Sequence, residues 1–246
     1  KNNKNIKRTI IGFDLNSERV NQLKDGFDKT NEIKENSKKF LNFIKFTNKP
    51  NDLIEADVFI VTVPTPIDKE NNPNLFFIEE ACKTIGKVLK SGTPHEKVPI
   101  IIFESTVYPG ATEEICMPLI KSYSNLKLCT DDNYKDTFGL GYSPERINPG
   151  DKLHNISSIV KVTSGNTRNI ANWVDQFYKS IIDAGTHKTK SIIIAEAAKI
   201  IENTQRDLNI ALVNELSMIF NKLQIDTLDV INAAKTKWNF LPFKPG

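Results

Sequence analysis

Short apolar runs rich in β-branched residues alternate with amphipathic segments along most of this 246-residue chain. Three of the runs are almost wholly apolar, as strands covered on both faces of a parallel sheet must be. They occupy residues 9–13 (TIIGF), 58–63 (VFIVTV) and 98–103 (VPIIIF). Segments of helical periodicity with turn signals at their ends occupy residues 17–25, 75–90 and 111–121. This alternation predicts an α/β fold with a doubly wound parallel sheet and right-handed crossovers.

The pattern changes in the last part of the chain. After a weaker strand at 157–163 and a helix at 167–180, residues 192–223 contain neither glycine nor proline and stay helical in pattern throughout. At 1.5 Å per residue this helix would be about 45 Å long, more than a crossover needs, so we interpret it as a spine between domains or subunits. Asp226 is placed to cap a short helix that ends near Lys235. We therefore predict a sheet domain at 1–188 and a helical domain at 189–246.

The charge balance argues against a nucleic-acid binder. The formal net charge is +3, from 33 basic and 30 acidic residues, and the longest basic feature is the scattered set Lys1, Lys4, Lys7 and Arg8. Such a weak field suits a solvated terminus better than contact with a phosphate backbone. We expect no nucleic-acid partner, and steep salt-dependent DNA binding would contradict that expectation.

Cysteine usage and hydropathy narrow the class further. Cys82, Cys116 and Cys129 are widely spaced, without a Cys-x-x-Cys pair or a nearby histidine cluster, so we expect no metal site and a reducing cytoplasm. No apolar run approaches the length of a membrane span, and the charged start lacks the apolar core of a signal peptide. The sequence predicts a soluble protein that is neither exported nor bound to a membrane.

Polar or stiff loops follow the predicted strands at their carboxyl ends, where open α/β sheets bind ligands. Asp14 ends the first strand, where an acidic residue can accept hydrogen bonds from the ribose hydroxyls of a dinucleotide; a simple turn residue is the alternative. Residues 63–66 (VPTP) follow the second strand, and their prolines either stiffen the loop against a nucleotide or merely end the strand.

Two further loops carry groups suited to chemistry. Residues 104–110 (ESTVYPG) precede a predicted helix, whose N-terminal donors can hold an anion, a carbonyl or a water, although Ser105 and Thr106 could simply cap the helix. Residues 141–150 (GYSPERINPG) place the Glu145 carboxylate in a rigid loop after another strand, where an exposed Glu145–Arg146 pair is the alternative interpretation.

The long helix carries a polar face. Lys199 and Asn203 are four residues apart and therefore share that face. Together they could stabilise an oxygen that gains negative charge. The alternative is a solvated stripe supported by pairs such as Glu202 with Arg206.

Taken together, the motifs resemble those of the UDP-glucose/GDP-mannose dehydrogenase family, and most closely its UDP-N-acetylglucosamine/UDP-N-acetylgalactosamine branch. Six segments occur in the family's order: GFDLNSERV, VFIVTVPTPID, ESTVYPGATEE, GYSPERINPGD, AEAAKIIENTQRDLNIALVNEL and TKWNFLPFKPG. The resemblance runs nearly end to end. It implies that residues 1–188 form a Rossmann-like NAD-binding domain and residues 189–246 a central helix and dimerisation domain.

The resemblance also implies a reaction and roles for single residues. Members of the family use NAD to oxidise the C6 alcohol of a nucleotide sugar twice, through a cysteine-bound thiohemiacetal and thioester. By resemblance, Thr106 positions water, Glu145 acts in the acid/base and hydrolysis steps, and Lys199 and Asn203 stabilise the oxyanion. The implied cofactor contacts are Asp14, Arg19, Val63, Pro64, Thr65, Ser105 and Thr106. The implied substrate contacts are Tyr142, Ser143, Pro144, Glu145, Arg146, Ile147, Lys199, Asn203, Phe243, Lys244 and Gly246.

The expected protein is thus a UDP-N-acetylhexosamine 6-dehydrogenase of polysaccharide synthesis that forms a homodimer through the long helix. UDP-glucose and GDP-mannose are the competing substrates, and a non-catalytic remnant with a nucleotide-sugar or dimer surface is the competing class. The family's glycine-rich phosphate loop would precede residue 1, and its catalytic cysteine would follow Gly246. We therefore expect a fragment, with exposed apolar sheet edges and no turnover by the 246 residues alone.

Overall fold

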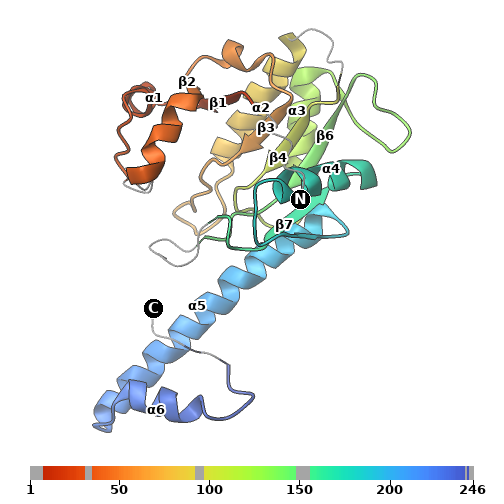
Figure 1. Ribbon diagram of the computed structural model, residues 1–246. Coiled ribbons are helices and arrows are strands. Elements are labelled where there is room, and N and C mark those ends of the chain that lie inside the picture. The colour runs from red at the N-terminus through yellow and green to blue at the C-terminus, as the bar shows by residue number, and fades with distance from the viewer. Residues whose placement is uncertain (1–7, 31–34, 92–96, 148–155, 242, 244–246) are drawn as a thin grey trace.

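The structure, a computed structural model, describes residues 8–30, 35–91, 97–147, 156–241 and 243. Figure 1 shows a layered body of strands and helices from which one long helix, α5 (Ile192–Lys222), projects. A short helix, α6 (Thr227–Ala234), lies beside the far end of α5. The doubly wound α/β domain and the long helix predicted from the sequence are both confirmed.

Among the described residues, the main sheet has six strands. Five of them follow the order β3-β4-β6-β7-β8: Val58–Val61, Ile100–Phe103, Thr137–Tyr142, Lys161–Gly165 and Thr186–Lys188. The sixth, β5 (Lys127–Leu128), also pairs with β6. All neighbouring pairs are parallel except β6 with β7, which is antiparallel. The expected parallel sheet is therefore a mixed one, with its one antiparallel pair among the described strands at β6 and β7.

Helices cover both faces of this sheet, which is why its central strands are apolar throughout. Every residue of β4 is buried. Ile101 and Phe103 belong to a core with helices α2 (Phe76–Ser91) and α3 (Met117–Ser124). Ile100 and Ile102 belong to a second core with helix α4 (Arg168–Lys179). A strand buried on both faces cannot alternate polar and apolar residues, and this accounts for the IIIF run.

The first strand lies outside the main sheet. β1 (Ile10–Phe13) pairs in parallel with β2 (Ile44–Thr47) to form a separate two-stranded sheet. Helix α1 (Ser17–Lys24) and the 3₁₀ helices η1 (Glu35–Phe43) and η2 (Pro50–Leu53) accompany it. Ile10 on β1 and Ile60 on β3 are 50% and 43% exposed. The single continuous sheet expected from the strand pattern is therefore split in two, with apolar side chains open to solvent on both parts.

Local departures from the predicted elements have physical causes. The segment predicted as one regular helix begins with a π-helical turn, η3 (Thr112–Cys116), before α3. Pro118 has no N–H to bond the carbonyl of residue 114, so the regular ladder is interrupted there. β2 was missed because its sequence, IKFT, alternates apolar and polar residues over only four positions and so has no apolar run.

Helix α5 has two unlike parts. Near its start, Ile192, Ala195, Glu196 and Lys199 are buried against the body of the protein, whereas Val213 is the buried residue farther along. No helix in the described ranges is long and apolar enough to cross a membrane. Helix α5 therefore packs against the body of the protein at its N-terminal end, and much of its remaining length is exposed to solvent.

Candidate active site

The loops after β3 and β4 are tied together at the carboxyl edge of the sheet. Ser105 is 7% exposed, and its hydroxyl donates a hydrogen bond of 2.6 Å to the carbonyl oxygen of Val63. This contact places the VPTP loop, with Pro64 exposed and Thr65 partly exposed, against the loop that carries Thr106. The two loops that we expected to bind a nucleotide therefore lie side by side.

A buried ionic cluster lies directly beneath the Thr106 loop. The Lys161 ammonium is 3.0 Å from a carboxylate oxygen of Glu104 and 5.1 Å from the centre of the Tyr178 ring. The Tyr178 hydroxyl donates a hydrogen bond to the other carboxylate oxygen of Glu104. Burial, and then the neighbouring Glu104 carboxylate, raise the pKa of Tyr178 far above its usual value, so the phenol stays a donor.

The loop after β6 is fixed to the same strand end. The Ser143 N–H donates to the Phe103 carbonyl at 2.9 Å, and the Ser143 hydroxyl donates to the Val162 carbonyl at 2.6 Å. Tyr142 and Ser143 are both fully buried, so in this structure their side chains lie in the core and support the loop. The substrate contacts implied for these two residues stay predictions.

Glu145 and Lys199 meet at the end of that loop. The Lys199 ammonium, 7% exposed, donates a hydrogen bond to the backbone carbonyl of Glu145. The Glu145 carboxylate accepts a hydrogen bond from the N–H of Ile147. Burial disfavours the charged ammonium and lowers the pKa of Lys199, while the nearby carboxylates of Glu145 and Glu202 oppose the shift. The structure thus brings together two of the predicted catalytic residues from distant parts of the chain.

Asn203 lies one turn farther along the same helix, and Arg146 from the loop after β6 contacts that helix through Glu202. Asn203 is exposed, and its side-chain oxygen accepts a hydrogen bond of 3.5 Å from Arg206. Arg146 forms a two-point ion pair with Glu202, at 2.6 and 3.0 Å, and donates to the Val160 carbonyl. Glu202 therefore pairs with Arg146, which comes from a distant loop, whereas helical spacing had suggested Arg206. An open hollow of about 360 Å³ is lined by Arg146, Ile159, Glu202, Gln205, Arg206 and Asn209.

The predicted ribose site lies on the smaller sheet. Asp14 is exposed at the end of β1, and one of its oxygens accepts a hydrogen bond of 2.8 Å from the Asn16 N–H. Arg19 on α1 is held by the buried Asp28 at 2.8 Å, while its second terminal nitrogen is buried without a hydrogen-bond partner among the described residues. The exposed Asp14 carboxylate has acceptor capacity left for a ligand that carries hydroxyls.

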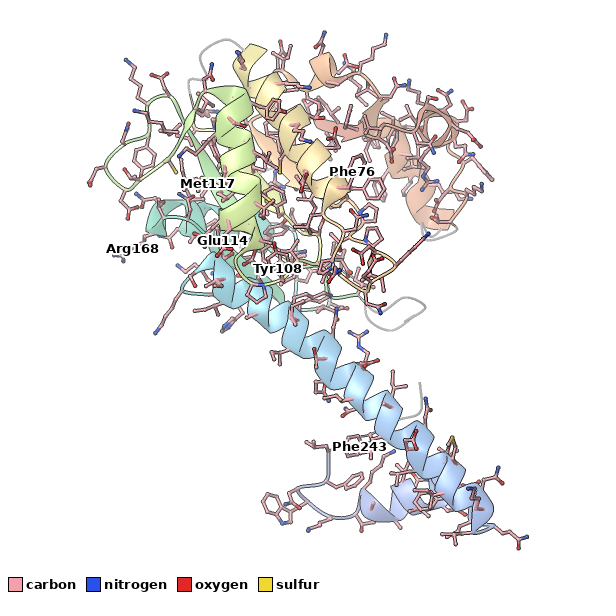
Figure 2. All side chains as sticks on the ribbon, turned by 180° about the vertical axis from the view of Figure 1, so that it is seen from behind. Phe76, Tyr108, Glu114, Met117, Arg168 and Phe243 are labelled. Carbon is pink, nitrogen blue, oxygen red and sulfur yellow. The ribbon has the colours of Figure 1, made fainter. Side chains whose placement is uncertain are left out.

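Other predicted groups lie elsewhere. Phe243 stacks edge-on with Phe240, 5.3 Å between ring centres, and Figure 2 shows it beside the outer part of α5, well away from Tyr108 on the Thr106 loop. Within one chain, Phe243 therefore lies away from the Thr106 loop, while Lys244 and Gly246 lie outside the described residues. Cys82, Cys116 and Cys129 are all buried and unpaired. In the described ranges no group of three or more potential metal ligands occurs.

Four important residues were missed from the sequence. Glu104, Lys161 and Tyr178 form the cluster below the Thr106 loop, and Glu196 on α5 is fully buried. The first three come from different elements, so no local pattern could reveal them. Glu196 could have been noticed because it precedes Lys199 by three residues and thus faces the same way.

Comparison with known proteins agrees with this arrangement. Residues 3–182 match the NAD binding domain of the UDP-glucose/GDP-mannose dehydrogenase family, and residues 194–246 match its central domain. The chain belongs to this family. Among similar proteins are UDP-N-acetyl-D-glucosamine 6-dehydrogenases of Pseudomonas aeruginosa, 55% identical over 98% of the chain, and of Salmonella typhi, 49% identical over 97%.

Solved structures give the same fold. UDP-D-ManNAc dehydrogenase of Pyrococcus horikoshii superposes with a TM-score of 0.82 over 97% of this chain and 54% of that chain, at 27% identity. The chain covers 54% of the Pseudomonas aeruginosa protein and 53% of the Salmonella typhi protein. It thus spans about half the length of these family members.

Proposed function

We propose that this chain forms the cofactor half, and part of the substrate site, of an NAD-dependent dehydrogenase that oxidises the C6 alcohol of a UDP-N-acetylhexosamine to the acid. One observation carries the proposal: the Lys199 ammonium binds the Glu145 carbonyl at the carboxyl edge of the sheet. That contact joins the helix and the loop to which the family assigns its oxyanion-stabilising and acid/base groups.

The proposed chemistry follows from the positions of these groups. Lys199 is held by one hydrogen bond and keeps further N–H donors for an oxygen that gains negative charge. Its burial strengthens that interaction, because fewer waters compete with the developing charge. Thr106 is partly exposed and can orient a water, and Glu145 supplies a carboxylate for proton transfer.

The residues present fit a dinucleotide. The exposed Asp14 carboxylate can accept hydrogen bonds from ribose hydroxyls, and Arg19, held by Asp28, lies on the helix that follows it. Thr65 and Thr106 offer hydroxyls from the two joined loops. NAD, when bound, supplies the hydride acceptor for the oxidation, while the side chains of this chain bind, orient and exclude water.

The choice of a UDP-N-acetylhexosamine rests on two relatives at 55% and 49% identity that are both named UDP-N-acetyl-D-glucosamine 6-dehydrogenase. The test is NADH formation by the protein purified from its native source, with UDP-N-acetylglucosamine, UDP-N-acetylgalactosamine, UDP-glucose and GDP-mannose supplied separately. We expect N-acetylated sugars to give the highest kcat/KM. Equal or faster oxidation of UDP-glucose would remove the proposed specificity.

A variant pair tests the role of Lys199. Lys199→Met should lower kcat about 10²–10³-fold, the usual cost of removing one group that stabilises a developing oxyanion. Lys222→Met removes an exposed lysine from the last turn of the same helix and should leave kcat unchanged. Unchanged kcat in Lys199→Met would contradict the proposed role.

The 246 residues alone are expected to give no turnover. The family's reaction requires a nucleophilic cysteine, whereas Cys82, Cys116 and Cys129 are buried. Calorimetric titration with a UDP-sugar, run beside the NADH assay, separates binding from turnover for this chain. NADH formation by the 246 residues would overturn this expectation.

The buried thiols of the chain also support a reducing, cytoplasmic location, which cell fractionation can test.

We further propose that the long helix pairs two copies of the chain. The exposed apolar side chains Ile201, Leu208, Leu212 and Ile219 follow a heptad-like spacing along α5 and are 45–66% exposed. A continuous stripe of this kind on a projecting helix suits a self-complementary contact between identical helices.

Light scattering after size-exclusion chromatography tests the dimer. Leu208→Lys combined with Leu212→Lys should convert a dimer to a monomer, because charges would be buried in the contact. Asn214→Lys places the same charge on the opposite side of the helix and should leave the dimer intact. A monomeric unaltered chain would remove the proposal.

A further inference from the structure

Glu196 is a fully buried carboxylate near the start of α5. One of its oxygens accepts a hydrogen bond of 2.7 Å from the Gly110 N–H, and the other accepts one of 3.0 Å from the Thr112 N–H. A buried carboxylate is costly unless it is hydrogen-bonded, and here both oxygens have strong backbone donors. The Glu196 side chain is therefore held in one position by these two hydrogen bonds.

The two donors lie at the beginning of the η3–α3 helical segment. Gly110 has φ of +98°, a left-handed conformation that favours glycine and turns the chain into the helix. The N–H groups at a helix start attract an anion, and the sequence predicted a ligand there. In the structure the anion is a side chain of the protein itself. Figure 2 shows Tyr108 and Glu114, which flank these donors, beside the first turns of α5.

The same turns of α5 also hold the other catalytic loop. Lys199 lies three residues after Glu196, and its ammonium binds the Glu145 carbonyl. Glu196 thus fastens the loop that carries Thr106, and Lys199 fastens the loop that carries Glu145. One short stretch of helix therefore fixes both loops through buried hydrogen bonds.

We propose that Glu196 is a positioning residue, which sets the Thr106 loop relative to Lys199 and Glu145. Only the expected kinetic effect rests on the function proposed above. The hydrogen bonds that hold the loop belong to this chain whatever reaction it serves. Glu196 acts through the backbone of residues 110–112 and touches no reacting atom in this scheme.

Amide hydrogen exchange of the 246-residue chain tests the fastening. Glu196→Gln keeps the shape but puts an N–H₂ group opposite a backbone N–H, so at least one bond is lost. Exchange at the amides of Gly110 and Thr112 should become about 10- to 100-fold faster, the factor that corresponds to one hydrogen bond to a charged group. Glu114→Gln is the matched control: it removes an exposed carboxylate from the same first helical turn and should leave these amides unchanged.

Kinetics of the native-source protein test the consequence. Glu196→Gln should lower kcat about 10- to 100-fold with a much smaller change in KM for NAD, because misplacement of catalytic groups by about 1 Å costs that much. A purely structural role would lower the melting temperature and leave kcat per folded molecule unchanged. Glu196→Asp, whose charge is kept on a shorter side chain, should restore part of kcat.

The outcomes separate the two proposals. Unchanged exchange at residues 110–112 in Glu196→Gln, or equal acceleration in Glu114→Gln, overturns the fastening. Unchanged kcat per folded molecule overturns the positioning role. If the unaltered protein oxidises no UDP-sugar, the proposed function fails while the exchange result still decides the fastening. If Glu196→Gln does not fold, exchange in Glu196→Asp gives the decision, since its shorter side chain cannot reach both amides.

Discussion

The two sheets of this protein differ in how firmly the loops at the ends of their strands are fixed in place. In the six-stranded sheet all residues of β4 and β6 are buried, and ionic and hydrogen-bonded groups sit beneath the loops that follow them. In the two-stranded sheet Thr47 is buried, Ile10 and Lys45 are exposed, and the other strand residues are partly buried. The comparison indicates that the loops after β4 and β6 are fixed by packing, whereas the segment that carries Asp14 and Arg19 is less deeply buried.

The largest expected effect comes from the ionic cluster under the Thr106 loop. Glu104→Gln leaves the Lys161 ammonium, which is 5% exposed, without its counter-charge and should lower the free energy of unfolding by about 3–5 kcal/mol. The exposed pair of Asp52 with Lys45 in the small sheet should show far less loss in Asp52→Asn. Urea unfolding measures both. The double variant Glu104→Gln, Lys161→Met should regain stability; if it does not, the buried charge is not the cause.

Core substitutions sharpen the contrast between the sheets. Ile102→Ala in β4 removes a fully buried side chain and should cost about 2–5 kcal/mol of unfolding free energy. The same change at Ile10 in β1, which is 50% exposed, should cost less than about 1 kcal/mol. Equal losses in denaturant titration would show that the small sheet is packed as firmly as the large one.

The smallest effect concerns pH. Burial would raise the pKa of Asp175, but hydrogen bonds from Lys179, Thr186 and Thr163 outweigh it and hold the pKa below its usual value. Because the folded-state pKa is depressed, the stabilisation is complete above the ordinary pKa of about 3.8 and is lost as pH falls through the lower folded value. The stability difference between the unaltered chain and Asp175→Asn should therefore be largest at neutral pH and shrink below about pH 4. A difference that does not change with pH would contradict this assignment.

Salt dependence distinguishes the exposed carboxylate beside the small sheet from the carboxylate beside the large sheet. Hydrogen bonds from Thr47, and then from Lys45, lower the pKa of Asp52, but this carboxylate is exposed. Its pKa, followed by NMR, should move towards the ordinary value in high salt, whereas that of Asp175 should change little. Equal salt dependence would indicate that both carboxylates are equally accessible.

Much of the fold follows from patterns that lie along the chain. The IIIF run of β4 needs helices on both faces, and the stretch without glycine or proline after Ile192 needs one long helix. The motifs also identified Lys199 and Glu145, because a helix face and a strand-end loop are local features. β2 and the π-helical turn of η3 were missed, since short elements leave no periodicity to detect.

What the sequence determined by itself is therefore the class of fold and the family, because these depend on local periodicity and on ordered motifs; the chemical roles of the strand-end loops stay predictions. Only the tertiary structure decided that Glu196 occupies the helix start near Gly110, that Lys161 pairs with Glu104, and that Tyr142 is buried. Each of these facts depends on contacts between residues that are distant in the chain. Such contacts arise when burial forces polar groups to find partners, and that choice is made in three dimensions.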